Sequence, residues 1–440
     1  MERPGVTVTD ASPEETTLIK RLAWRLLPLL VLLFLVAFID RQNVGFAKLE
    51  MLSDLKFSEA AYGFGASMFF IGYVIFEVPS CLALDRFGAR IWLARLMFSW
   101  GVVTVLLAFT SSKEMFYILR FLLGVAEAGF YPGVVFYISE WFPEPHRIRM
   151  LGYFTLGSSL GNMMGGPLNG FFLTLGGTLG LTGWQWIFLG TGLPAILLTF
   201  VVLVYLPASP RTATILNDKE RALLAAAHDR SVKPEHQGTP WAALWDPRVL
   251  VFSGIYVLLV TAFYGATYWL PTVVHEFGVK PTTNGFLNMI PWGIGVVALL
   301  LIPRILVDDR SVLLAVAAIT LLGSLSFVTG VLVQDATLRF VALAVGGPCI
   351  AVLNPCFWIF PSRMFAGARA AASIATINSI GNLGGFLAQN LAPKVESLTG
   401  KVVGPMLVPA GCLAILCVLA LLVLFLMSRS SRSLVQETSH

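Results

Sequence analysis

Residues 22–46 read LAWRLLPLLVLLFLVAFIDRQNVGF, and this stretch decides the class of fold. A helix needs about 20 mostly apolar residues to cross a bilayer. This run is also too long for the apolar region of a cleavable signal peptide. Near its end stand Asp40 and Arg41, two charges inside an apolar helix. The stretch therefore predicts a membrane helix that carries ionisable groups.

The rest of the chain has a similar composition. Of its 440 residues, 56% are hydrophobic and only 12% are charged, with a mean hydropathy of +0.78, whereas soluble proteins carry about 25% charged residues. These values exclude an ordinary soluble enzyme, a secreted disulfide scaffold and a disordered protein. We expect an all-α membrane protein with twelve transmembrane helices in two six-helix bundles. The apolar segments lie near 22–46, 60–84, 89–110, 115–139, 149–174, 184–206, 246–271, 284–306, 311–333, 336–361, 368–392 and 402–427.

The longest polar interval, 207–245, divides these segments six and six. The expected parts are an N-tail (1–21), an N-terminal bundle (22–206), a linker (207–245), a C-terminal bundle (246–427) and a C-tail (428–440). Twenty of the 30 Lys and Arg residues lie on the side of the tails and the linker. The positive-inside rule therefore predicts a multi-pass protein of the cell (inner) membrane with both termini cytoplasmic. The net charge of +5 has the same origin, so we expect the lipid bilayer and no nucleic acid as partner, and a monomer.

The two halves resemble each other at a nearly constant offset. Pro132 corresponds to Pro355 at 223 residues, and Ser159-Leu-Gly-Asn162 corresponds to Ser379-Ile-Gly-Asn382 at 220. Together with two further matches in the same order, this indicates a parallel duplication of six helices. Such halves typically hold a substrate between them near the middle of the membrane.

Five ionisable residues lie well inside predicted helices: Asp40, Arg41, Glu77, Arg120 and Glu127. A charge at the bilayer centre costs about 2.5–3.5 kcal/mol, so these side chains should face one another or water inside the bundle. We expect Asp40 to pair with Arg120, which leaves Arg41 free to meet Glu127 or a ligand anion. The alternative is that buried ion pairs only hold the helices together. Because such pairs seldom add net stability, we favour a functional role.

The second half replaces these charges with aromatic and amide groups. At the offset of 223, Asp40 and Arg41 correspond to Phe263 and Tyr264. Asn378 and Asn382 share a helix face, since they are four residues apart. With Trp358, and with Tyr73 of the first half, they are candidate ligand contacts. For each of them, packing between helices is the alternative.

Two patterns concern movement between helices. One is a ridge of small residues suited to close helix approach, formed by Gly157, Gly161, Gly165, Gly166 and Gly170. Packing is its main interpretation, and a movable interface is the alternative. The other is a short loop whose Asp85, Arg86 and Arg90 we interpret as a cytoplasmic gate latch, with a simple basic turn as the alternative.

No pattern indicates a metal, a cofactor or catalysis. The five cysteines lie in apolar runs without a Cys-x-x-Cys spacing, the five histidines are scattered, and no phosphate-binding loop occurs. We therefore expect no enzyme. A membrane sensor would need a sizeable soluble output domain, for which the 13 residues after Met427 are too few. A transporter that does not hydrolyse ATP is the favoured interpretation.

On these residues the chain resembles the major facilitator superfamily and, within it, the anion:cation symporter family in its tartrate, phthalate and sugar-acid permease branch. The motifs that carry the resemblance are Asp40-Arg-Gln-Asn-Val-Gly45, Phe76-Glu-Val-Pro-Ser80, Asp85-Arg-Phe-Gly-Ala-Arg90, Arg120-Phe-Leu-Leu-Gly-Val-Ala-Glu127, Gly183-Trp-Gln-Trp186 and Asn378-Ser-Ile-Gly-Asn382. The loop motif departs from the family at Cys81, where the family has Gly. The resemblance implies a proton-coupled importer of a small organic anion that works by alternating access, with an anion uniporter or exporter as the alternative.

The resemblance also implies roles for single residues. Asp40 and Glu127 match proton carriers, whereas Arg41 and Arg120 match the two membrane arginines. Substrate contacts are implied for Tyr73, Trp358 and Asn378; Ser158 aligns with a Gln of the sugar-acid branch, and Phe38 with a Tyr. These two departures argue against assuming the same sugar acid. Asn382, with Glu77 and Tyr264 as further candidates, completes the expected site.

Overall fold

The computed structural model describes residues 12–229, 246–301, 309–365 and 368–437. Parts of the expected N-tail (1–11), linker (230–245) and C-tail (438–440) lie outside the described residues. The described residues are mostly helical, and no strand occurs in these ranges. Where the tails are described, the helices continue into them, because helix α1 begins at Pro13 and helix α15 ends at Glu437.

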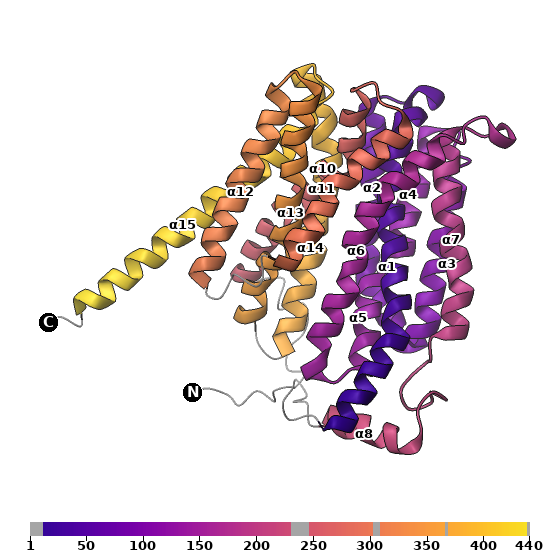
Figure 1. The fold of residues 1–440 in the computed structure, drawn as a ribbon, viewed down its shortest axis with the longest axis vertical. Coiled ribbons are helices and arrows are strands. Elements are labelled where there is room, and N and C mark those ends of the chain that lie inside the picture. Colours follow the sequence, from indigo (N-terminus) through magenta and orange to yellow (C-terminus); the bar gives the residue numbers. More distant parts are fainter. Residues whose placement is uncertain (1–11, 230–245, 302–308, 366–367, 438–440) are drawn as a thin grey trace.

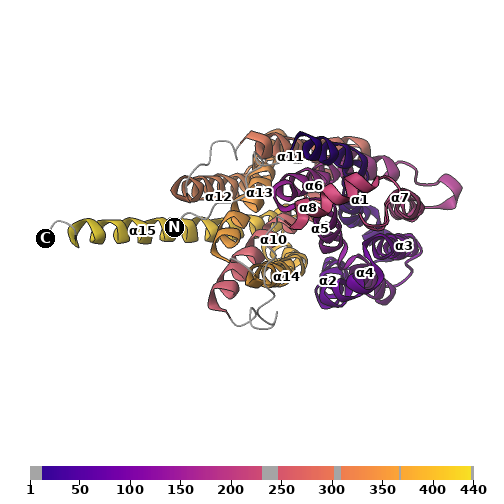
Figure 2. The ribbon, with the colours of Figure 1, turned by 90° about the horizontal axis from the view of Figure 1, so that it is seen from below.

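Two groups of helices stand side by side (Figures 1 and 2). The N-terminal half contains α1 (Pro13–Leu55), α2 (Glu59–Phe87), α3 (Ala89–Leu107), α4 (Lys113–Glu127), α5 (Phe130–Trp141), α6 (Glu144–Leu173) and α7 (Gly183–Tyr205). The C-terminal half contains α10 (Pro247–His275), α11 (Pro281–Leu301), α12 (Asp309–Leu332), α13 (Ala336–Met364), α14 (Ala368–Thr399) and α15 (Leu407–Glu437). In the order of the chain, α8 (Asp218–Asp229) comes between the two halves, and short 3-10 turns occur at Thr178–Gly180 and Gly404–Met406.

Counting α4 and α5 as one span, the described residues hold twelve long segments, six in each half, as the sequence predicts. Within these residues nine spans are long and apolar enough to cross a membrane by composition alone. Helices α6 and α14 are the least apolar of the remaining segments. Each of them packs against the opposite half, α6 on α11 and α14 on α2. A helix turned toward protein needs fewer apolar side chains than a helix surrounded by lipid.

The fourth segment differs from expectation, because it is broken rather than continuous. Gly129 separates α4 from α5 with a φ of 87°, a left-handed conformation that favours glycine. A Cβ there would lie 2.2 Å from the Ser80 hydroxyl. Pro132 follows at the start of α5 and lacks the backbone N–H that a continuous helix would use. Glu127 is consequently the last residue of α4.

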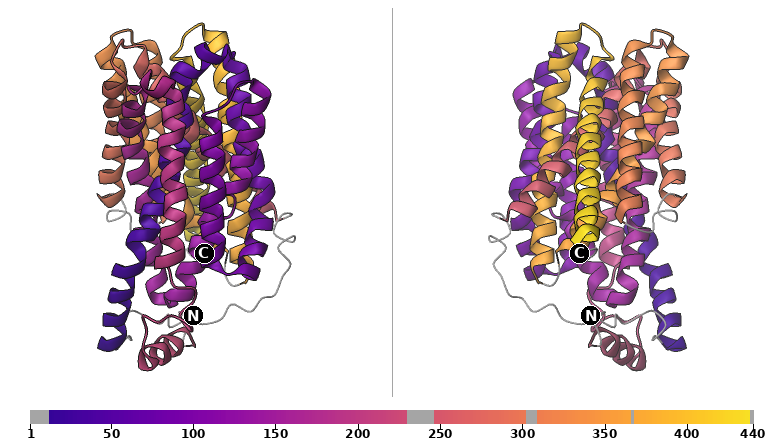
Figure 3. Two further views of the ribbon diagram at one scale, coloured as in Figure 1. Left: turned by 90° about the vertical axis from the view of Figure 1, so that its right-hand side faces the viewer. Right: turned by 90° about the vertical axis from the view of Figure 1, so that its left-hand side faces the viewer.

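The first described turn of α1 and the last described turn of α15 lie toward the same end of the bundle, together with α8 (Figures 1 and 3). We call this the tail end. The opposite end, which holds the last turn of α1 and the first turn of α2, is the far end. At the tail end Arg21 of α1 pairs with Glu220 of α8 at 2.8 Å, so the described part of the linker is attached to the N-terminal half.

The glycine ridge of α6 has two partners. Gly157 and Gly161 face backbone carbonyls of α1, where an added Cβ would come within 2.6 Å. Gly166 and Gly170 face α11 of the other half equally closely, at 2.5 Å from the carbonyls of Gly285 and Pro281. The ridge therefore packs within one half and also forms part of the interface between the halves.

Candidate functional site

Four of the five predicted ionisable residues are buried or mostly buried in the middle of the N-terminal half, on α1 and α4. Asp40 is fully buried, and Arg120 and Glu127 are each 1% exposed. Arg41, the neighbour of Asp40, is 13% exposed. None of these groups points to lipid, as expected from the cost of a charge in hydrocarbon.

Arg41 and Glu127 form an ion pair. The Nε and Nη2 atoms of Arg41 both lie 2.9 Å from Oε2 of Glu127, which confirms the expected contact. The Nη1 atom of Arg41 donates to the hydroxyl of Tyr264 at 3.3 Å. Tyr264 belongs to the other half and is the residue that the repeat offset of 223 assigns to Arg41. The two equivalent positions of the duplication thus meet across the interface.

Aromatic rings surround the guanidinium of Arg41. Its carbon lies 5.2 Å from the ring centroid of Phe38, 5.6 Å from Phe69 and 5.4 Å from Tyr73. Cations are attracted to such ring faces. In this mostly apolar environment the strength of the ion pair depends on whether Glu127 is charged.

Asp40 does not pair with Arg120, so that expectation is wrong. The carboxylate of Asp40 accepts hydrogen bonds from Asn43 at 2.9 Å and from Thr104 at 3.1 Å. Asp40 therefore faces α3 within its own half. Arg120 turns the other way, toward α2, where its Nη2 atom donates to the carbonyl of Ala66 at 3.2 Å. In the part of the chain that the structure describes, Arg120 has no carboxylate partner.

Glu77 joins the two halves on the tail side of this centre. Its side chain, 7% exposed, accepts a hydrogen bond from Asn378 at 3.1 Å and another from the hydroxyl of Ser379. The Asn382 amide donates to the backbone carbonyl of Asn378 at 3.0 Å. The structure thus brings together two of the predicted amides and Glu77, which the sequence offered only as a further candidate.

Two predicted contacts lie apart from these hydrogen bonds. Trp358 packs edge-on against Tyr256, with ring centroids 5.0 Å apart, and so belongs to an aromatic cluster of the C-terminal half. Ser158 donates to the carbonyl of Thr155 on its own helix at 2.7 Å. Their roles toward a substrate stay predictions.

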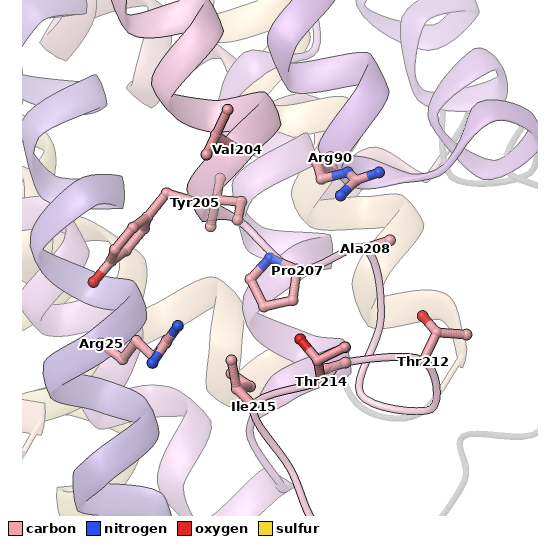
Figure 4. A pocket seen from close by; sticks show the side chains of 11 residues that line it. Arg25, Arg90, Val204, Tyr205, Pro207, Ala208, Thr212, Thr214 and Ile215 are labelled. Atoms are coloured by element: carbon pink, nitrogen blue, oxygen red, sulfur yellow. The ribbon is translucent and has the colours of Figure 1, made fainter.

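The predicted latch residues Asp85, Arg86 and Arg90 flank Gly88, which alone connects α2 with α3. Asp85 and Arg86 are exposed, and no ion pair joins the three within the described ranges. Arg90 instead borders a surface pocket of about 320 Å³ at the end of α7, together with Arg25 (Figure 4). The latch stays a prediction.

At the far end the halves meet through a buried lysine. Lys48, 3% exposed, pairs with Glu59 at 2.7 Å and lies 3.4 Å above the ring of Trp269 in the other half. Glu396, beyond the apolar segment 368–392, lies near this pair. Burial and the charge of Glu59 raise the pKa of Glu396 to about 7, while Lys48 opposes the shift.

Sequence reasoning missed several polar groups near the centre. Asn43 was detectable, because it lies one turn after Asp40 on the same helix face. Gln389 was detectable for the same reason, since it continues the face of Asn378 and Asn382. Tyr268 and Thr104 carried no such signal. Among the described residues, no group of three His, Cys, Asp or Glu side chains is placed to hold a metal ion.

Comparisons with known proteins agree with this architecture. The Major Facilitator Superfamily profile matches residues 30–389. A quinolone resistance transporter of Acinetobacter baumannii is 42% identical over 386 residues, which cover 85% of this chain and 87% of that protein. A putative tartrate transporter of Agrobacterium vitis is 37% identical, covering 98% and 95%. The inward open xylose transporter XylE from E. coli shares the fold, with a TM-score of 0.71 at 18% identity, covering 91% and 95%.

Proposed function

This chain belongs to the major facilitator superfamily, and from that premise we propose that it is a secondary transporter that takes up a small organic anion together with protons. Transporters of this superfamily move small molecules across membranes and are not enzymes. The observation that carries the proposal is the buried ion pair of Arg41 with Glu127, which lies against Tyr264 of the other half. In the proposal the tail end faces the cytoplasm, the protein is a monomer of the inner membrane, and the two bundles are residues 22–206 and 246–427.

The ion pair supports a competition mechanism. While Glu127 is ionised, it occupies two of the nitrogen atoms of Arg41. A proton on Glu127 removes the negative charge, and Arg41 then binds the carboxylate of the substrate instead. Charge-assisted hydrogen bonds are about twice as strong as neutral ones. Arg41 therefore binds the ionised carboxylate of the substrate more strongly than the protonated carboxyl of Glu127. Anion binding and proton binding therefore favour each other.

Asp40 is a second proton carrier in this proposal. It is fully buried and held by the hydroxyl of Thr104 and the amide of Asn43, without a cation in contact. A carboxylate in such a place is costly to keep ionised. Protonation from the far end and release toward the tail end would let Asp40 carry its proton with each cycle.

The contacts of Glu77 couple ligand binding to the movement of the two halves. Glu77 of α2 is bound to Asn378 and Ser379 of α14, so these bonds must break for the halves to separate at that level. A ligand that takes over the Asn378 amide would weaken the connection between the halves. Binding at the centre is thereby linked to opening toward the tail end.

Uptake into proteoliposomes with an imposed pH gradient tests the proposal. The panel contains tartrate, sugar acids, phthalate and hydroxyphenylacetate, each as a radiolabelled anion. We expect at least one to accumulate above its external concentration when the outside is acidic. Glu127→Gln should abolish that accumulation but retain exchange of internal for external anion. Glu140→Gln, a half-buried carboxyl outside the site, is the matched control. Accumulation by Glu127→Gln at the wild-type level would contradict the role of Glu127.

Export is a second candidate, because the quinolone resistance transporter that this chain resembles has a name that indicates drug removal. The same charges could serve proton-driven export in exchange for inward proton movement. In the assay above, an exporter would expel internal anion when the outside is acidic. A uniporter would equilibrate the anion whether or not a pH gradient is present.

A further inference from the structure

Three buried polar atoms at the interface of the halves have no hydrogen-bond partner within the described residues. The first is Nε of Arg120, whose side chain is 1% exposed. Within the described residues its guanidinium donates one hydrogen bond, from Nη2 to the carbonyl of Ala66. No carboxylate contacts it there, although Asp40 and Glu127 are near enough to interact with it electrostatically. Buried polar groups in folded proteins are nearly always satisfied. An unpaired guanidinium in this position indicates a site for an anion.

The second and third atoms come from the C-terminal half. The hydroxyl of Tyr268 has no partner, although the residue is 1% exposed. Oε1 of Gln389 also has none, and its residue is fully buried. The amide Nε2 of Gln389 donates to the carbonyl of Tyr264 at 3.5 Å. That contact determines the orientation of the amide, because a flipped amide would place two oxygen atoms against each other.

Close packing brings these groups to one level of the interface. On α2, Ala66 receives the hydrogen bond of Arg120, and one turn away Gly63 approaches the carbonyl of Gln389 so closely that an added Cβ would lie 2.3 Å from it. On α1, Gly45 approaches the backbone of Tyr268 in the same way, at 2.9 Å. The same short stretch of α2 thus contacts Arg120 of its own half and Gln389 of the other half, while α1 contacts Tyr268.

The subsite also lies near Arg41. Both guanidinium carbons flank the ring of Phe69, that of Arg41 at 5.6 Å and that of Arg120 at 5.1 Å from the ring centroid. Tyr264, which accepts from Arg41, packs against Tyr268 with ring centroids 5.5 Å apart. A short molecule with a charged group at each end can therefore reach both cations.

We propose that Arg120, Tyr268 and Gln389 form a subsite for the hydroxyl-bearing carboxyl end of a short dicarboxylate. Nε of Arg120 and the hydroxyl of Tyr268 donate to the carboxylate. Oε1 of Gln389 can only accept, so it needs a donor on the ligand, and a hydroxyl next to the carboxylate supplies one. The second carboxylate binds Arg41 once Glu127 is protonated, and in this respect the inference rests on the proposed function.

The test uses three four-carbon dicarboxylates that differ only in hydroxyl groups: tartrate, malate and succinate. Binding to the purified full-length protein is measured by calorimetry at acidic pH. Because leaving a buried acceptor unpaired is costly, we expect malate to bind about tenfold more tightly than succinate, and tartrate at least as tightly as malate. Equal affinities for malate and succinate would overturn the inference. So would the absence of binding by all three, which would leave uptake of another anion intact.

Two variants assign the contacts. Gln389→Met keeps the volume but removes the acceptor, so malate should bind only as weakly as succinate. Tyr268→Phe removes one donor to the carboxylate and should weaken malate and succinate alike, by about fivefold. Asn390→Met is the matched control, since its amide donates to the carbonyl of Phe386 on its own helix and has no other hydrogen bond among the described residues. Preserved discrimination by Gln389→Met would overturn the role of the amide. If an ordered water, and not a ligand hydroxyl, occupies the place beside Gln389, the wild-type protein should bind malate and succinate equally, which would also overturn the inference.

Discussion

Replacing Glu127 with Gln should separate anion binding from proton binding. In the structure Oε2 of Glu127 receives two nitrogen atoms of Arg41 at 2.9 Å each. Gln is almost the same size but carries no charge, so the packing of α4 against α1 is kept. The change releases Arg41 in the way that we propose for a proton in the wild-type protein. We expect Glu127→Gln to bind the transported anion more tightly at alkaline pH.

The magnitude follows from the contacts. The proposed competition requires the wild-type protein to take up one proton for each anion bound wherever Glu127 is ionised, so we expect the Kd to rise about tenfold per pH unit. In Glu127→Gln this slope should vanish. At alkaline pH the wild-type protein must break the pair of Glu127 with Arg41 before the anion binds. The variant has no such pair, so its anion affinity should be higher by the free energy of that contact. A hydrogen bond to a charged group contributes about 1.5–3 kcal/mol, which corresponds to roughly 10- to 150-fold in Kd.

Isothermal titration of the purified protein from pH 5 to pH 9 measures both quantities, with the carboxylate identified in the uptake screen as ligand. Glu140→Gln again serves as the control and should keep the wild-type slope. A Kd for Glu127→Gln that still rises tenfold per pH unit would refute the competition for Arg41. Weaker binding of the variant at alkaline pH would refute it as well.

Three further predictions concern other parts of the molecule. Asp40→Asn should keep the fold, because both of its partners also bind an amide, but should lose uphill accumulation in the proteoliposome assay; accumulation at the wild-type level would show that Asp40 carries no proton. Gly124→Ala should abolish the folded protein in size-exclusion chromatography, since its Cβ would lie 2.0 Å from a carbonyl of α2, whereas Gly152→Ala, with open space around it, should behave as wild type. Low pH should favour closure of the halves at the far end. In the closed state the pKa of Glu396 is raised to about 7, so Glu396 keeps its proton up to that pH, whereas in the separated halves it should lose the proton near pH 4.5. Distances between spin labels on α2 and α14 should therefore shift toward the open state as the pH rises from 4.5 to 7, and Glu396→Gln should remove that dependence.

The sequence alone determined the class of the protein and the position of its interior charges. Hydropathy is a sum over neighbouring residues, so twelve apolar segments can be counted without any knowledge of packing. The cost of a charge in hydrocarbon is likewise a local property, and it correctly placed Asp40, Arg41, Arg120 and Glu127 inside the bundle. The contact of Arg41 with Glu127 was one of two alternatives that the sequence left open, and the depth of the residues along their helices led to the wrong partner for Asp40.

Only the tertiary structure decided which way each side chain turns. Asp40 and Arg120 lie at matching depths, yet one faces α3 and the other α2, because rotation of a helix about its axis depends on close contacts with its neighbours. Such contacts are made by glycines like Gly63, where the backbone of one half meets the backbone of the other. The same packing brings Tyr264 to Arg41 and Gln389 to the level of Arg120. These pairs join residues far apart in the chain, and their side chains meet only when both halves are folded and placed together.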